Sequence, residues 1–186
     1  FRISVVFFIC QIHFLKLFAP WTSIETAIMV ADMSYSTVSN VIDSWEAVRR
    51  TENYEAVVGT KLFIKFFTLE PDAKVIFGFP KKVDGDIDEL VKSRRFIKHA
   101  QYFIQMIDKA LGMLGPDIEL LTEILMELGK KHVSYGVKPE YFPSMGRALI
   151  DAVASVLGAT FTEEIKDAWV EVYGALSYDM IRAQKK

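Results

Sequence analysis

From residue 36 onward, apolar side chains recur every three or four positions and almost nowhere alternate with a period of two. This spacing places them along one side of an α-helix, so the pattern predicts an all-α chain. The apolar stripes predict helices over residues 38–48, 54–69, 87 or 91 to 114, 117–132, 139–158 and 165–180. Only short corners separate these segments, so the helices must cross one another around a single core.

Prolines and polar residues mark where the predicted helices end. Pro71 biases Glu70 away from helical dihedral angles, so the second helix is expected to bend there and residues 71–77 to form at most a short turn. Residues 77–86 then form a corner. Before the last helix, either Thr160 and Glu163 make a capping box or Thr162 caps the helix alone.

The first 35 residues differ from the rest of the chain. Residues 3–15 form an uncharged, mostly apolar run that is shorter than the roughly 20 residues needed to cross a bilayer. A membrane partner is therefore not expected. The run has three interpretations: a truncated targeting segment, an extra helix, or sequence translated from upstream of a natural start near Met33, which we favour. We accordingly predict an extension over residues 1–35 and one domain over residues 36–186.

Composition narrows the functional classes. The 186 residues are 51% hydrophobic, and 22 basic side chains nearly balance 24 acidic ones, without a basic block that would bind nucleic acid. The single cysteine, Cys10, cannot form an internal disulfide, and no Cys/His cluster predicts a zinc site. A reducing compartment, the cytoplasm, fits this usage. We find no phosphate loop, metalloprotease motif, nucleophile elbow or Ser/His/Asp set.

Two of the three histidines lie on the apolar stripes of separate predicted helices. His99 and His132 are 33 positions apart, and a buried imidazole without a partner is costly. Each histidine alone is more often a satisfied core residue than a ligand, but together they suggest an iron porphyrin held between two helices. The disc of haem needs an apolar slot and at least one nitrogen ligand perpendicular to it.

His132 ends its stripe, so its Nε2 can point into such a slot while its Nδ1 donates to the carbonyl of Leu128, one turn earlier. His99 would stand on the other side of the iron, either donating a hydrogen bond to a bound gas or ligating the metal. Phe63, Phe77 and Phe103 would wall that side and exclude water, although phenylalanines at helical spacing are most often core residues.

Several segments resemble globins. They are residues 66–77, Leu-Gly-Lys-Lys-His at 128–132 followed by Gly-Val-Lys at 136–138, Trp45, and Ala-Trp with Tyr-Gly-Ala near the end of the chain. Together they span about residues 36–181. Leu-Glu-Pro-Asp at 69–72 and Leu-Gly-Lys-Lys-His at 128–132 resemble the neuroglobin-like branch of the family. The resemblance implies a globin fold of about seven or eight helices around a pocket for haem b.

The resemblance also implies roles for individual residues. The implied haem contacts are the proximal ligand His132, the distal His99, Phe77 stacked on the porphyrin at the corner, Phe63 in the distal pocket, and Val137 and Phe142 below the haem. Three positions depart from the pattern. Phe103 replaces a smaller valine or isoleucine, Tyr102 stands where a basic residue often meets a propionate, and Lys131 lacks the hydroxyl that many globins have before the proximal histidine.

The first functional hypothesis is reversible binding of dioxygen or another diatomic gas, for storage, transport or sensing. The second is a haem enzyme of the nitric oxide dioxygenase or nitrite reductase type. Because the chain carries no dinucleotide or flavin motif, such an enzyme would need an external reductase, and we rank it below gas binding. The third is a helical interaction module that has lost haem. The sequence leaves the oligomeric state open.

Overall fold

The computed structural model describes residues 33–79 and 87–185, and within these ranges it contains helices and no strand. The predicted all-α class is confirmed. The elements are α2 (Tyr35–Arg49), α3 (Tyr54–Leu69), the 3-10 turn η3 (Pro71–Val75), α4 (Ile87–Lys92), α5 (Arg94–Gly112), α6 (Ile118–Ser134), α7 (Tyr141–Leu157), η4 (Gly158–Thr160) and α8 (Glu163–Gln184). The predicted extension lies outside the described residues up to position 32, as does most of the corner at 80–86.

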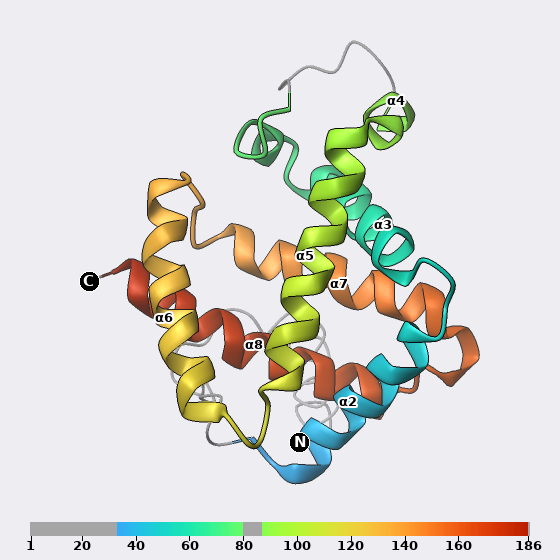
Figure 1. Cartoon of the computed structure of the whole chain (residues 1–186), viewed down its shortest axis with the longest axis vertical. Helices are drawn as coiled ribbons and strands as arrows, with labels where there is room; N and C mark the ends of the chain where they lie inside the picture. The colour runs from blue at the N-terminus through green and yellow to red at the C-terminus, as the bar shows by residue number, and fades with distance from the viewer. Residues whose placement is uncertain (1–32, 80–86, 186) are drawn as a thin grey trace, which may run out of the picture.

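The helices form two packing groups that share α7. Helix α3 packs against α5 and α7, whereas α8 packs against α2, α6 and α7. Figure 1 shows α5 crossing in front of α7, with α6 beside it at the edge of the molecule. A short connection joins the end of α5 to the start of α6. The two helices diverge from it, so their far ends lie well apart (Figure 1). In the described ranges, no helix combines the length and the apolar character required to cross a bilayer.

Buried aromatic and aliphatic side chains from every long helix make one core. Trp45 of α2 and Trp169 of α8 meet edge to face, with ring centroids 5.7 Å apart. At two crossings a glycine lets the backbones approach closely: a Cβ on Gly59 would overlap the carbonyl of Ala100, and one on Gly129 would overlap the backbone of Met180. These glycines therefore set the α3–α5 and α6–α8 crossings.

The predicted boundaries hold with two corrections. Glu70 leaves the helical region as expected (φ −128°, ψ 74°), and Thr162 caps α8 alone by accepting a hydrogen bond from the Ile165 backbone N–H. The continuous helix predicted from residue 87 or 91 is wrong, because Ser93 adopts an extended conformation and its hydroxyl caps a new helix at Phe96 N–H. The helix predicted to open at Pro139 begins two residues later, at Tyr141.

Candidate functional site

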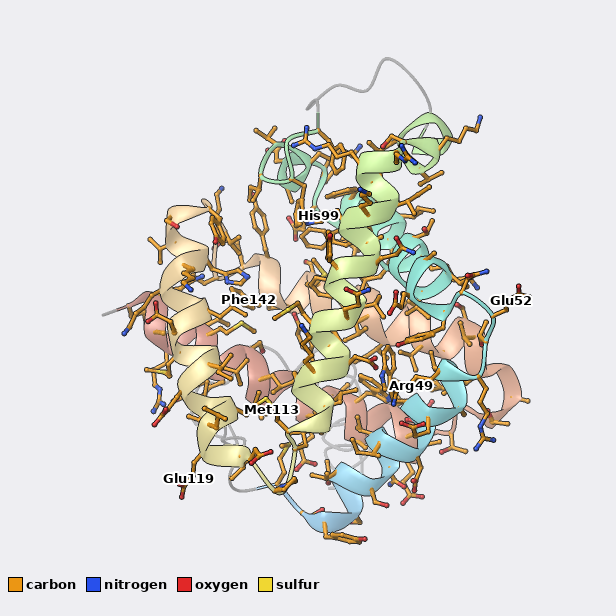
Figure 2. All side chains as sticks on the ribbon, in the orientation of Figure 1. Arg49, Glu52, His99, Met113, Glu119 and Phe142 are labelled. Carbon is orange, nitrogen blue, oxygen red and sulfur yellow. The ribbon has the colours of Figure 1, made fainter. Side chains whose placement is uncertain are left out.

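The topology brings the two histidines to the same end of the molecule. Five residues connect α5, which ends at Gly112, to α6, which begins at Ile118. His99 lies 13 positions before the end of α5, and His132 lies 14 positions after the start of α6. At 1.5 Å per residue, both are about 20 Å from the connection, near the open end of the diverging pair. Figure 2 shows His99 on the side of α5 that is turned toward α6.

The imidazole of His132 is held in one tautomer by its own helix. Its Nδ1 lies 2.7 Å from the carbonyl oxygen of Leu128, so the predicted hydrogen bond is confirmed. A carbonyl can only accept, which makes Nδ1 the donor and leaves the lone pair on Nε2. The ring also lies 5.7 Å from that of Phe142 and 6.2 Å from that of Tyr135, measured between centroids. With Nδ1 engaged in this way, Nε2 is the ring nitrogen that could ligate a metal.

Aromatic rings surround one side of His99. Its ring centroid lies 4.9 Å from that of Phe77 and 5.6 Å from that of Phe63, both edge to face. Phe63 in turn contacts Phe103 at 5.5 Å. The His99 side chain is exposed, so the expectation of a buried imidazole is wrong for this residue. Partial desolvation, and secondly the positive charge of Arg95, still lower the pKa of His99 below its ordinary value of 6.5. The imidazole is therefore neutral at physiological pH, the form that can donate one hydrogen bond or bind a metal.

Each of the two diverging helices also exposes apolar residues that the predicted stripes did not include. Met106 lies seven positions after His99 and shares its side of α5, yet its side chain is 47% exposed. On α6, Leu120 and Ile124 precede Leu128 at steps of four and are 51% and 41% exposed. The sequence signal for these three residues is their helical spacing from residues that were predicted: Met106 lies three positions after Phe103, and Ile124 lies four before Leu128. Exposed apolar side chains on the two helices that carry the histidines fit a flat, apolar group such as a porphyrin.

The remaining predicted residues lie around the same region. Val137 is half-buried just beyond α6, and its backbone N–H donates to the carbonyl of His132 over 3.0 Å. Phe142 is buried in the first turn of α7, where the Tyr173 hydroxyl donates to its carbonyl over 3.1 Å, and Figure 2 shows it between α5 and α6. Tyr102 and Lys131, two departures from the globin pattern, are exposed.

Comparison with known proteins decides the family. The family model for globins matches residues 60–180, about two thirds of the chain and both histidine-bearing helices. The chain is a globin. This globin is 30% identical to neuroglobin of Danio rerio over 144 residues, which cover 77% of this chain and 87% of the relative. It is 28% identical to neuroglobin of Tetraodon nigroviridis over 143 residues, with the same coverage. The predicted neuroglobin-like resemblance is therefore confirmed.

Solved structures agree on the fold. A hexacoordinated heme protein from an anhydrobiotic tardigrade superposes with a TM-score of 0.72 at 21% identity, over 83% of this globin and 96% of that chain. Hemoglobin of the botfly Gasterophilus intestinalis superposes with a TM-score of 0.70 at 17% identity, over 83% and 100%. The globin fold predicted from the sequence is thus confirmed, and family membership makes the chain a haem-binding protein.

Proposed function

We propose that this globin holds haem b between α5 and α6 and reversibly binds oxygen or another diatomic gas, for storage, transport or sensing. The observation that carries the proposal is the 2.7 Å hydrogen bond from His132 Nδ1 to the Leu128 carbonyl, which leaves Nε2 available as the proximal ligand. When bound, haem supplies a ferrous iron that coordinates small gas molecules. The protein contributes the ligand, the apolar slot and the exclusion of water.

The other predicted residues receive roles that follow from their positions. His99 serves the opposite side of the haem, as the hydrogen-bond donor to the gas or as a sixth ligand. Phe63, Phe77 and Phe103 form the aromatic wall on that side and keep water from the iron. The half-buried Val137 and the buried Phe142 contact the proximal face next to His132.

Optical spectra of the purified protein test the proposal. The parent protein mixed with haemin and reduced should show a Soret band, and its visible bands distinguish iron held by one histidine from iron held by both. We expect His132→Ala to lose haem or retain it only weakly, because no other imidazole on α6 can replace the ligand. His99→Ala should retain haem and show altered gas affinity or autoxidation.

His13→Ala serves as the control, because the proposal gives that third histidine no role. It should match the parent protein in both haem retention and gas binding. A parent protein without a Soret band would overturn the proposal. Equal haem loss in His132→Ala and His99→Ala would contradict the assignment of proximal and distal sides.

A further inference from the structure

Arg95 links the first turn of α5 to the corner that precedes it. Its Nη2 lies 3.4 Å from the carbonyl oxygen of Phe77, and its Cζ lies 5.6 Å from the centroid of the Phe79 ring. A guanidinium has both the N–H donors and the flat cationic face that these two contacts use. One side chain therefore holds the backbone and an aromatic ring of the same corner.

Gly78 leaves space for this guanidinium. Gly78, between the two phenylalanines that Arg95 contacts, has a φ of +70°, and a Cβ there would overlap Arg95 Nη2. A side chain at position 78 would therefore both strain the backbone and displace the guanidinium. Phe79 is buried and its ring also contacts that of Phe96, at 6.0 Å, so the cation rests on a ring that is itself fixed in the core.

Arg95 is connected to His99 both along α5 and through Phe77. Arg95 precedes His99 by four positions, so the two lie one turn apart on the same side of α5. The Phe77 carbonyl accepts from Arg95, and the Phe77 ring stands edge-on to the His99 ring at 4.9 Å. The position of the Phe77 ring relative to His99 thus depends on where Arg95 holds the Phe77 backbone.

We propose that Arg95 is a positioning residue for the distal histidine: by fixing Phe77 it confines the His99 imidazole and so controls how His99 acts on a gas at the haem. The inference rests on the proposed function for its effect on gas binding. Its structural part, the confinement of the His99 ring by Arg95 through Phe77, rests on contacts of the chain alone and can be tested without haem.

The first test follows the His99 ring directly, in the protein without haem. Carbon-13 correlation spectra recorded at pH 8, where the imidazole is neutral, should show the His99 ring protons shifted by the edge-on phenylalanine rings. Arg95→Met should move these signals toward the positions of an unconfined histidine, and Arg95→Lys should move them less because it keeps a cation over Phe79. Arg94→Met is the matched control, since it removes the same charge from the neighbouring exposed position.

The second test measures gas binding in a double-mutant cycle on the haem-loaded protein. We expect Arg95→Met to change the carbon monoxide association rate or the oxygen dissociation rate by about three- to tenfold, and the same substitution to have no effect in the His99→Ala background. Thermal unfolding of each variant is recorded so that a general loss of structure is recognised. Arg94→Met should leave both rates unchanged.

Two outcomes would overturn the inference: unchanged His99 signals in Arg95→Met, or an effect on gas rates that persists when His99 is alanine. Failure of the proposed function looks different, because then the parent protein lacks a Soret band. In that case the spectra of the haem-free protein still decide whether Arg95 confines His99.

Discussion

At the scale of single residues, burial of the Asp179 carboxylate in α8 lowers the stability of the folded state. Its side chain is only 1% exposed, and its Oδ1 accepts from Arg182 Nη2 over 3.1 Å. Its Oδ2 is buried without a hydrogen-bond partner among the described residues. Desolvation raises the pKa of Asp179 above its ordinary value of 3.8, and the nearby charge of Arg182 only partly opposes the rise. The ionised carboxylate is therefore destabilising on balance.

We predict that Asp179→Asn stabilises the protein at neutral pH, by on the order of 1 kcal/mol, because the amide keeps an acceptor for Arg182 without a buried charge. The folded state holds the Asp179 proton more tightly than the unfolded chain does, so the parent loses stability as the pH rises above 3.8 toward the raised pKa. Urea unfolding at several pH values checks this. The advantage of Asp179→Asn should grow across that window, whereas the exposed Asp167→Asn should show none. Equal stability of Asp179→Asn and the parent at pH 7 would contradict the prediction.

At the scale of elements, the crossing of α6 over α8 places the helix that carries His132. Helix α6 touches α8 through Gly129, where an added Cβ would overlap the backbone of Met180 and crowd Ala183. The neighbouring Leu125 and Leu121 are buried on the same side. The angle and depth of this crossing therefore fix how far His132 reaches toward α5.

Gly129→Ala should consequently destabilise the protein by about 1–3 kcal/mol, since a backbone contact cannot give way as a flexible side chain does. Gly174→Ala is the matched control: it lies within α8, where an added Cβ meets nothing within 4 Å, and should stabilise by about 0.5–1 kcal/mol through helix propensity. Chemical denaturation measures both. If Gly129→Ala were as stable as Gly174→Ala, the close approach of α6 to α8 at Gly129 would not contribute to the free energy of unfolding.

The elements also show what could be read from the sequence. Long amphipathic stripes, the bend before Pro71 and the cap at Thr162 follow from local rules, and each agrees with the structure. The break at Ser93 was missed because the apolar spacing continues across it, and only the hydroxyl bond to Phe96 N–H ends one helix and begins the next. Sequence periodicity does not register a cap inside an unbroken stripe.

The site was predictable where chemistry is local and hidden where it depends on packing. The bond from His132 to the Leu128 carbonyl spans one helical turn, so residue spacing alone predicted it. The exposed apolar side chains Met106 of α5 and Leu120 and Ile124 of α6 could be recognised only after the structure showed which apolar residues the core leaves uncovered. The hydrogen bond from Arg95 to the Phe77 carbonyl joins residues 18 positions apart and depends on the left-handed backbone of Gly78, so residue spacing could not predict it.

At the scale of the whole molecule, the two helices that carry the histidines belong to different packing groups. Helix α5 rests on α3, and α6 rests on α8, while Met106 of α5 and Leu120 and Ile124 of α6 stay exposed. A group bound between α5 and α6 would cover exposed apolar surface and join the two packing groups. Binding to the folded state alone stabilises it, by about 4 kcal/mol when the free ligand exceeds its dissociation constant a thousandfold.

We therefore predict that haem raises the unfolding temperature by several degrees or more and slows hydrogen exchange in α6 and in the first half of α5. Helix α2, which packs on α8, should change little because it takes no part in the proposed site. Calorimetry and hydrogen exchange with mass spectrometry, with and without haemin, make the comparison. His132→Ala should lose most of the gain, because the haem then lacks its protein ligand from α6. A gain of the same size in His132→Ala, or protection spread evenly over all helices, would mean that haemin binds the surface rather than the space between α5 and α6.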